Sequence, residues 1–441
     1  MRRILAPFML ALTGLILTAC GGSTNTDQTV ENTDDLPRAT AEEMEAIVEQ
    51  FIMAEDGEVI EIPAGYYEFT TQLILDGVDD VTVRGAGMEK TILSFEGLAA
   101  GGEGVRAVDC ENVVFEDFTA QDSPGDCIKT QHCDGVTFRR LNTTWTGGEK
   151  SENGIYAIYP VQCNRVLVEE CVASHSRDAG IYVGQSTNII VRNNHAFGNV
   201  AGIEIENSDN AEVYGNLAEN NTGGILVFNL PGLPKRFGRN TRIYDNDILN
   251  NNHVNFADAI SESNNGNAVT QIPPGSGVVL LACDEVEVSN NRIHGNKTVG
   301  IAVASYYITG FPVEEDSLWS PYVSDISIHD NSFERPMAPA DLSKDLGKLI
   351  SAKNAHGVGK TQDIIWDGIV DEARGTDPAA NPMNICIDEE EAAELNFTRF
   401  DLVTYGETGK DSDIGAFGDI EPFLCSYTVE TDVSSVADLA R

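Results

Sequence analysis

The stretch GIYVGQSTNIIVRNN at residues 180–194 and the stretch GIEIENSDNAEVYGN at residues 202–216 are two copies of one pattern. Each copy begins with Gly and alternating apolar residues, and each ends with a second strand-like segment closed by Asn. The copies start 22 residues apart. They lack the apolar period of about 3.6 residues that marks an amphipathic helix. Because a unit this short cannot enclose a core, the repeat predicts a solenoid in which each coil packs on the next.

The Gly pattern recurs along the middle of the chain. Further copies are GVRAV from Gly104, GIYAI from Gly154, GILVF from Gly224, GVVLL from Gly277 and GIAVA from Gly300, with DCIKT from Asp126 as a degenerate copy. Successive starts of the eight copies lie 22, 28, 26, 22, 22, 53 and 23 residues apart, so the period is 22 to 23 residues and the excesses are insertions. Alternating apolar segments in every copy predict parallel strands stacked about 4.8 Å apart, and therefore an all-β parallel β-helix.

Two rows of equivalent residues support this stacking. The second segment ends at Asn194, Asn216, Asn246, Asn291 and Asn331. Stacked Asn side chains bond to one another and tolerate left-handed backbone, so we expect a structural ladder. A small residue precedes the same segment, at Cys110, Cys133, Cys163, Ser186, Ser208 and Cys283. Stacked Cβ atoms about 4.8 Å apart are too distant for the roughly 3.5–4.5 Å of a disulfide, which predicts packed free thiols.

The N-terminus has the pattern of an export signal. Two arginines precede an apolar stretch at residues 4–17, which is too short to span a bilayer. The quartet LTAC at 17–20 resembles a bacterial lipobox, in which cleavage before the Cys lets its sulfur and amino group carry lipid. We expect a lipoprotein signal peptide at 1–19, lipidation at Cys20 and a cell-envelope location, with Gly21 favouring the outer membrane. The alternative is an ordinary signal peptide with a chance Cys.

Composition indicates how the rest of the chain is divided. Residues 20–40 are polar and acidic without an apolar period, which predicts a flexible tether. Thr40 and Glu43 form a capping box before an apolar helical face, so we expect a helix that covers the open end of the solenoid. We place the β-helix with this cap at 41–335 and an irregular C-terminal cap at 336–441.

The C-terminal region contains two cysteines outside the repeat. An exported chain permits disulfides, and we expect a bridge between Cys386 and Cys425. The function of this region cannot be derived from its sequence.

Charge excludes one class of partner. Seventy acidic residues against 28 basic residues give a formal net charge of −42, which makes nucleic acid an unsuitable ligand. The same field disfavours a polyanionic glycan unless divalent cations intervene.

Four insertions break the period, at 143–153, 231–240, 252–276 and 306–324. Long loops on a regular solenoid usually carry the function. Some precede a Gly pattern and some come after one, so they emerge at opposite edges of the same strand. We therefore expect them to wall a trough over the outer face of that strand.

Alternation within the Gly pattern predicts which side chains line the trough. The first and third residues after Gly are apolar and should point inward, which leaves the second and fourth outward. The expected outward residues are Arg106 and Val108, Lys129 and Gln131, Tyr156 and Ile158, Tyr182 and Gly184, Glu204 and Glu206, and Leu226 and Phe228.

The middle of this row, with the turn before Gly180, has the residue types used in sugar recognition and acid/base chemistry. The candidate substrate-binding residues are Tyr156, Tyr182 and His175. The candidate catalytic residues are Asp178 or Glu204 as acid/base, Glu206 beside them, and Lys129 or Arg177 as charge stabiliser.

Glu204 and Glu206 lie two residues apart on one strand, so their carboxyl groups are expected about 7 Å apart, within the range of inverting glycosidases. Neighbouring carboxylates also suit Ca²⁺, and an ordinary exposed β face would carry the same residues. The sequence leaves these interpretations open and identifies no metal.

Four stretches carry a family resemblance: WTGGEKSENGIYAIYPVQC at 145–163, RDAGIYVGQSTNIIVRNN at 177–194, NVAGIEIENS at 199–208 and NTGGILVFNLPGLP at 221–234. Together they resemble exported bacterial parallel β-helix repeat proteins of the right-handed β-helix, pectin-lyase-like superfamily. The resemblance implies a right-handed coil, export, often as a lipoprotein, and a second exported protein as a partner. It implies no activity and no catalytic residues.

One shorter match is incomplete. Gly125-Asp126-Cys127-Ile128 resembles part of the polygalacturonase site, but the Gly-His-Gly and Arg-Ile-Lys of that pattern are missing.

We therefore predict an envelope-anchored β-helix lipoprotein that binds or processes a polysaccharide on the outer face of one parallel sheet. An enzyme of this kind would be a polysaccharide lyase, hydrolase or epimerase. The alternative is a non-enzymatic scaffold that holds a partner envelope protein.

Overall fold

The computed structural model describes residues 35–257, 268–313, 316–353, 360–389, 392–402 and 414–440. The chain divides into two units, Met1–Asp35 and Leu36–Arg441, and the helices and strands from Ala41 onward belong to the second. The expected signal peptide, the lipidation site at Cys20 and most of the expected tether lie outside the described residues. No helix within the described ranges is long and apolar enough to span a bilayer.

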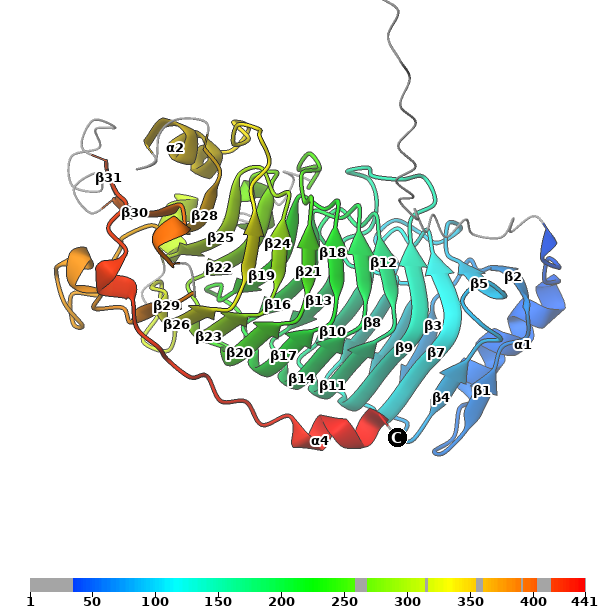
Figure 1. Ribbon diagram of the computed structural model, residues 1–441. Coiled ribbons are helices and arrows are strands. Elements are labelled where there is room, and N and C mark those ends of the chain that lie inside the picture. Colours follow the sequence, from blue (N-terminus) through cyan, green and yellow to red (C-terminus); the bar gives the residue numbers. More distant parts are fainter. Residues whose placement is uncertain are drawn as a thin grey trace, which may run out of the picture. The chain divides into compact units, whose positions relative to one another are not determined.

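The second unit is a parallel β-helix, in which strands of successive coils stack along one axis (Figure 1). One of its sheets has twelve strands within the described residues, all paired in parallel except the last two. These strands are β3 (Leu73–Asp76), β6 (Val105–Val108), β8 (Ile128–Gln131), β10 (Ile158–Val161), β13 (Ala179–Gly184), β16 (Ala201–Glu206), β19 (Gly223–Phe228), β22 (Ser276–Leu281), β25 (Val299–Ala304), β28 (Gln362–Trp366), β30 (Phe397–Asp401) and β31 (Gly415–Phe417).

The other sheet has nineteen strands in the described part of the chain, arranged in two series that the long strands β7 and β9 join. The first series is β1 (Val59–Glu61), β4 (Thr82–Arg84), β7 (Glu111–Gln121), β9 (Asp134–Thr144), β11 (Asn164–Glu169), β14 (Thr187–Arg192), β17 (Asp209–Tyr214), β20 (Arg239–Tyr244), β23 (Asp284–Ser289), β26 (Ser324–His329) and β29 (Ile385–Asp388). The second adds β2 (Gly65–Glu68), β5 (Thr91–Ser94), β12 (Val172–Ser174), β15 (His195–Phe197), β18 (Leu217–Glu219), β21 (Asp247–Leu249), β24 (Arg292–His294) and β27 (Ser332–Glu334). A regular coil therefore has three strands, as in β13, β14 and β15.

Helical segments lie outside the coils. The α-helices are α1 (Ala41–Ile52), α2 (Asp345–Lys353) and α4 (Ser434–Ala437), and the 3₁₀ turns are η2 (Ala268–Gln271), η3 (Tyr306–Thr309), η4 (Pro378–Ala380), η5 (Ala392–Glu394), η7 (Glu421–Phe423) and η8 (Asp438–Ala440).

Helix α1 forms the expected N-terminal cap. The Thr40 side chain accepts from the backbone N–H of Glu43, and the Glu43 side chain accepts from Thr40 N, which is the predicted capping box. Ile47 and Phe51 of α1 are buried in the main core. Contacts with the solenoid begin before the helix, however, because Arg38 forms an isolated parallel β-bridge with Tyr66 of β2. The prediction of a flexible tether up to residue 40 is therefore wrong for its last residues, from Arg38.

The interior confirms the predicted stacking. Ile181 of β13 lies opposite Ile203 of β16, which lies opposite Ile225 of β19, and all three are fully buried. Like residues in successive coils thus share one core, as a period of 22 residues requires.

The Asn row forms the predicted hydrogen-bonded ladder. Each Nδ2 donates to the next Oδ1, at 3.0 Å from Asn194 to Asn216, 2.9 Å from Asn216 to Asn246, 2.9 Å from Asn246 to Asn291 and 3.0 Å from Asn291 to Asn331. Each Oδ1 also accepts from the backbone N–H of the Asn in the preceding coil, at 3.0 Å for Asn194 N. The side-chain oxygens therefore satisfy two donors each.

The left-handed backbone lies one position before the ladder, not at the ladder residues as expected. Positive φ angles occur at Asn193 (56°), Gly215 (64°), Asp245 (55°), Asn290 (55°) and Asp330 (56°). The residue with positive φ turns the chain, and the next residue then projects its amide into the solenoid.

A second ladder was not predicted. Asn199, Asn221, Asn251 and Asn296 bond in the same way, at 3.1, 3.0 and 3.2 Å. Each comes after a residue with positive φ at the end of the third strand of its coil. The row is visible in the sequence as a second Asn five residues after the first.

The predicted packed free thiols and the predicted C-terminal disulfide are confirmed. Cys110, Cys133 and Cys163 are buried free thiols in neighbouring coils. Ser186 continues the row and accepts from Cys163 N at 3.1 Å. A disulfide joins Cys386 to Cys425.

The coils continue beyond residue 335, where the sequence analysis placed their end. Strand β28 pairs with β25, β29 pairs with β26, and β30 pairs with β28. Long segments between these strands, including α2, obscure the period in the sequence.

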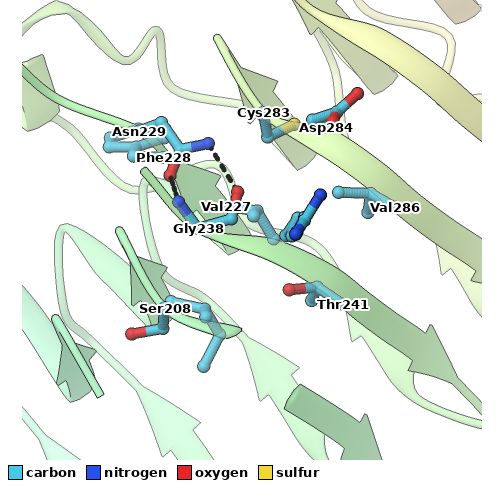
Figure 2. A pocket seen from close by; sticks show the side chains of 11 residues that line it. Ser208, Val227, Phe228, Asn229, Gly238, Thr241, Cys283, Asp284 and Val286 are labelled. Atoms are coloured by element: carbon cyan, nitrogen blue, oxygen red, sulfur yellow. Dashed lines mark hydrogen bonds between the residues drawn. The ribbon is translucent and has the colours of Figure 1, made fainter. Parts of the chain in front are cut away.

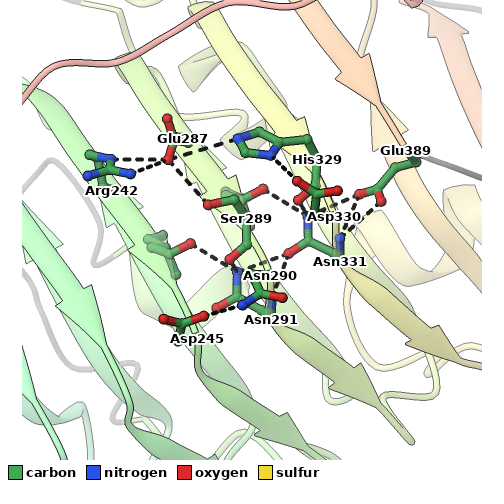
Figure 3. A network of polar contacts seen from close by, with 12 residues as sticks. Arg242, Asp245, Glu287, Ser289, Asn290, Asn291, His329, Asp330, Asn331 and Glu389 are labelled. Atoms are coloured by element: carbon green, nitrogen blue, oxygen red, sulfur yellow. Dashed lines mark hydrogen bonds and ion pairs between the residues drawn. The ribbon is translucent and has the colours of Figure 1, made fainter.

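Figure 3 shows how the first Asn ladder ends in this added part. Asn331 donates from Nδ2 to Glu389 Oε1 at 3.0 Å and from its backbone N to Glu389 Oε2 at 3.0 Å. Beside the ladder, Arg242 donates to Glu287 Oε1 at 3.0 and 2.9 Å, and Glu287 is buried. At the end of the ladder, the carboxylate of Glu389 therefore takes the place of a further Asn as the acceptor.

The C-terminal segment runs back along the nineteen-stranded sheet to α4 (Figure 1). Val436 of α4 packs with Leu167 and Ile190 on the outer side of β11 and β14. Arg139 Nη2 donates to Leu439 O at 3.2 Å.

Candidate functional site

The outward side chains of the twelve-stranded sheet are buried from β13 to β28, and from β19 to β25 they are apolar. These apolar side chains, such as Leu226 and Phe228, lie in a second apolar core with residues of the insertions. The insertion residues in this core include Ile272, Tyr306 and Trp319, and Trp319 Nε1 donates to Asn229 O at 3.1 Å. The prediction of an open trough is wrong for this half, because apolar outward side chains are more stable under a cover.

The strands before β19 carry polar and aromatic side chains on the same face. Pairing places Arg106 of β6 opposite Lys129 of β8, and Lys129 opposite Tyr159 of β10. Tyr182 of β13 lies opposite Glu204 of β16. These five positions form one outward row.

The row contains Tyr159, not Tyr156 as predicted. Ile158, expected to point outward, is fully buried and lies opposite Ile181, so β10 begins where the Gly pattern from Gly154 ends. Gly154 and Gly180, which begin the two Gly patterns, lie 26 residues apart, whereas Cys163 and Ser186 in the following segments lie 23 residues apart. The strand register matches the shorter spacing, because the inward apolar residues decide the pairing.

Tyr156 still contributes to the site from the segment before β10. Its ring centroid lies 4.2 Å from that of Tyr182 and 4.6 Å from that of Tyr159, and the Tyr159 and Tyr182 centroids are 5.0 Å apart. We call these three residues the tyrosine cluster. Tyr182 is buried, whereas Tyr156 and Tyr159 are half-buried and form its outer part.

Gly184 makes room for the Tyr182 ring. A Cβ at Gly184 would lie 2.3 Å from Tyr182 Cε1 and 2.6 Å from its Oη, so the ring occupies the space over this glycine. From there Tyr182 Oη donates a hydrogen bond to Glu206 Oε1. The missing side chain thus allows a tyrosine of one coil to reach a carboxyl of the next.

Asp178, Glu204 and Glu206 form a buried acid cluster beside these rings, with exposed fractions of 3, 3 and 6%. Burial raises the pKa of Glu204 well above its ordinary value, and the charges of Asp178 and Glu206 raise it further. Glu204 Oε2 is buried without a hydrogen-bond partner. The alternative of an ordinary exposed β face is therefore wrong for these two glutamates, although both lie on the predicted outer face.

Glu206 has a pKa shifted to near neutrality. Burial raises its pKa to about 7, the hydrogen bond from Tyr182 opposes the rise, and the charge of Asp178 adds to it. A carboxyl with this pKa can hold or release a proton near neutral pH, as acid/base catalysis requires.

The other end of the row is cationic. Lys129 Nζ lies 2.7 Å from Glu103 Oε1, and Arg106 Nη1 lies 3.1 Å from Glu103 Oε2. Lys129 Nζ is also 3.8 Å from Asp126 Oδ2 and 4.9 Å from the centroid of the Tyr159 ring. Burial raises the pKa of Asp126 to about 6, with Lys129 opposing and Glu103 adding to the rise.

His175 and Arg177 lie at the rim, not on the face. His175 Nε2 lies 4.0 Å from Glu149 Oε1, and the ring contacts Phe197 with centroids 5.5 Å apart. Burial lowers the pKa of His175, and the Glu149 charge opposes this. Arg177 Nη1 donates to Ser151 O at 3.3 Å, so both residues hold the 143–153 insertion.

Two insertions meet near this rim. Glu149 Oε1 of the 143–153 insertion lies 3.8 Å from His253 Nε2 of the 252–276 insertion. They are thus side by side at one edge of the candidate site, as their positions before a Gly pattern predicted.

The geometry does not support the interpretation of Glu204 and Glu206 as ligands of a Ca²⁺ ion. In the described part of the chain, no group of three or more His, Cys, Asp or Glu side chains is arranged to hold a metal ion.

A hollow elsewhere is structural. Figure 2 shows it between neighbouring coils, lined by Ser208, Val227, Thr241 and Val286 among others, where Asn229 and Gly238 exchange hydrogen bonds of 2.9 Å. It has no space for a water molecule. The Asn229 and Gly238 bonds close the base of the insertion between them.

Three site residues were not predicted: Glu103, Asp126 and Tyr159. Asp126 belongs to the Gly-Asp-Cys-Ile match, and Tyr159 lies 23 residues before Tyr182, as the cysteine row would have indicated. Glu103 precedes the pattern at Gly104 and had no sequence signal of its own.

Comparison with known proteins concerns the fold. A family model described as "Right handed beta helix region" matches residues 103–270 and 149–318. No curated protein sequence matches the chain.

Among solved structures, the A-module of the Azotobacter vinelandii mannuronan C-5 epimerase AlgE4 is similar at 16% identity and a TM-score of 0.44, over 74% of this chain and 86% of that one. A GH87 α-1,3-glucanase from Streptomyces thermodiastaticus matches at 15% and 0.45, over 75% and 48%. An exopolygalacturonase from Thermotoga maritima matches at 15% and 0.40, over 62% and 70%. These similarities carry no argument about activity.

Proposed function

We propose that this right-handed parallel β-helix protein binds a polysaccharide along the outer face of β6, β8, β10, β13 and β16, and acts on it there. The observation that carries the proposal is one outward row in which a cationic pair, the tyrosine cluster and the acid cluster succeed one another. Tyrosine rings offer apolar faces with a polar tip, which suits sugar rings and their hydroxyl groups.

The length of the row suits a polymer. Lys129 and Glu204 are three strands apart along the sheet. At about 4.8 Å per strand this is roughly 14 Å, enough for a short run of sugar units. The order of the groups gives the ligand a direction, because the cationic and acidic ends differ.

The chemistry centres on Glu206. Its pKa of about 7 makes it the acid/base group, with Tyr182 Oη as its hydrogen-bond donor. Lys129 stabilises negative charge that develops on the ligand. This assignment replaces Asp178 or Glu204 as the acid/base, and a lyase, hydrolase or epimerase would each use such a set.

Tyr159→Ala tests the binding surface. We expect glycan affinity to fall at least roughly tenfold on an immobilised glycan panel, because the half-exposed ring of the tyrosine cluster is lost. Tyr214→Ala is the matched control, since Tyr214 is also half-buried and stacks on Tyr244 at 4.9 Å, but on the other sheet. Equal glycan binding by both variants and the unaltered protein would contradict the proposed binding site.

Export and anchoring belong to the same proposal. The lipobox at 17–20 supports lipid attachment at Cys20 and an outer-membrane location. Growth of the expressing cells with a labelled fatty acid should label the protein, and Cys20→Ala should abolish the label. An unlabelled protein would instead favour an ordinary signal peptide.

The scaffold alternative makes a different prediction. A stoichiometric protein partner recovered from native membranes, without glycan binding, would favour a scaffold that holds an exported partner.

A further inference from the structure

The acid cluster has no balancing cation for its two glutamates. Within the described residues, neither Glu204 nor Glu206 forms an ion pair with Lys or Arg. The Tyr182 hydroxyl is the one donor to their side-chain carboxyl groups among the described hydrogen bonds. Glu204 is 3% exposed, and its Oε2 has no hydrogen-bond partner. A buried acceptor without a donor costs free energy that a ligand donor would recover.

The tyrosine cluster already accommodates an ammonium group. Lys129 Nζ lies 4.9 Å from the centroid of the Tyr159 ring, which is the geometry of a cation–π contact. Lys129 is itself held by Glu103 at 2.7 Å and therefore stays at the first end of the row. Tyr182 is buried and stacks on Tyr156, so the half-buried rings of Tyr156 and Tyr159 are the ones that a ligand cation can contact.

Net charge points to the same ligand class. With a formal charge of −42, the chain attracts polycations and repels polyanions over a Debye length of about 8 Å at physiological ionic strength.

We propose that the polysaccharide is one whose sugars carry free amino groups, bound with an ammonium group between the tyrosine cluster and Glu204 and Glu206. This inference rests on the proposed function and specifies its substrate class. The ammonium donates to the unpartnered carboxyl oxygen of Glu204, and its charge replaces the protons that the two glutamates otherwise hold. Binding at about pH 6 therefore releases protons, because a nearby cation lowers the pKa of both carboxyl groups.

The experiment compares three short oligosaccharides by calorimetry at about 150 mM salt, where the Debye length is about 8 Å. They are a β-1,4-linked glucosamine tetramer, the same tetramer with every nitrogen acetylated, and a tetramer of galacturonate. We expect the free-amine tetramer to bind at least roughly tenfold more tightly than the other two. Titration in two buffers of different ionisation enthalpy should show net proton release.

The variants separate the site from general attraction. Glu204→Gln and Glu206→Gln should each weaken the amine tetramer at least roughly tenfold and reduce proton release. Glu111→Gln removes the same charge at an exposed position of the other sheet and should leave both unchanged. Gln has the shape of a protonated carboxyl, and thermal unfolding checks that each variant folds. Proton release by the unaltered protein tests the inference even if one variant does not fold.

Each outcome is decisive. Amine binding that depends on the two glutamates supports the inference. Amine binding unaffected by Glu204→Gln and Glu206→Gln overturns it, since general charge then explains the affinity. Binding of only the acetylated or the galacturonate tetramer overturns the amino-sugar inference but keeps the proposed function. Binding of no glycan by a folded protein overturns both.

Discussion

Two rows of side chains run along this solenoid and differ in almost every respect. The Asn ladder from Asn194 to Asn331 repeats one residue inside the coil, and each amide bonds to the next at 2.9 to 3.0 Å. The outward row from Arg106 to Glu204 changes residue type at nearly every coil. It ends on a buried carboxyl oxygen without a partner.

The difference separates stability from function. A row of identical residues satisfies each polar group with its neighbour and needs no ligand. A row of different residues cannot do this, so charge and hydrogen-bonding capacity are left over at the acid cluster. Unsatisfied buried groups and shifted pKa values are typical of functional sites.

Asn246→Ala should have the largest effect on the comparison. Asn246 Oδ1 accepts from Asn216 N at 3.0 Å and from Asn216 Nδ2 at 2.9 Å, and both donors would lose their partner inside the coil. We expect the free energy of unfolding to fall by about 3 kcal/mol, measured by denaturant titration. Asn142→Ala is the control, since half-buried Asn142 donates one bond to Thr119 Oγ1 and should cost about 1 kcal/mol or less. Equal losses would show that the ladder has no special role.

Glu206→Gln should change how stability depends on pH. The folded pKa of Glu206 is about 7 against an ordinary 4.5, so the folded protein holds a proton that the unfolded chain releases. The resulting stability is present below pH 4.5 and is lost as the pH rises towards 7, by up to about 3 kcal/mol. Unfolding midpoints at about pH 5 and about pH 8 should therefore differ less in Glu206→Gln than in the unaltered protein. Glu111→Gln should leave that difference unchanged, and an unaltered pH dependence in Glu206→Gln would contradict the assignment.

Gly184→Ala should affect the outward row without weakening the ladder. The added methyl group occupies the position of the Tyr182 ring and displaces its hydroxyl from Glu206. Without this bond Tyr182 no longer holds the Glu206 carboxyl in place for the ligand, so we expect glycan affinity to fall roughly tenfold. The backbone at Gly184 does not have positive φ, so only the displaced ring and its lost bond destabilise the fold, and we expect a smaller loss of unfolding free energy than for Asn246→Ala. A large loss of stability with normal binding would reverse the roles we assign to the two rows.

Glu389→Gln should have the smallest effect, because it alters only the end of the ladder. The Gln amide keeps one oxygen for Asn331 Nδ2, which donates to Glu389 Oε1 at 3.0 Å. We expect a loss of about 1 kcal/mol or less in the free energy of unfolding. A loss as large as that of Asn246→Ala would mean that the terminal acceptor controls the whole ladder.

Much of the fold could be predicted, because stacking makes residues one period apart into neighbours. The Gly pattern, the first Asn row and the cysteine row each identify the coil, and the capping box at Thr40 identifies the terminal helix. The late strands β29 and β30 escaped notice because long segments separate them from the regular coils.

The candidate site could be predicted only in part. Glu204, Glu206 and Tyr182 were placed on the correct face, since alternation decides which side chains point outward. The Gly pattern predicted Tyr156 in the outward row, where the structure has Tyr159 opposite Lys129, because an insertion shifts the Gly pattern relative to the strand. The cover over Leu226 and Phe228 was not predicted, since local patterns do not show where a loop folds.

The sequence by itself determined the coil, its period, its inward residues and the chemical types on its outer face, because these arise from contacts repeated every 22 residues. Only the tertiary structure decided which outward residues are buried and which pKa values are shifted. Those properties depend on insertions that return to the sheet from distant parts of the chain, and desolvation acts through space and not along the sequence.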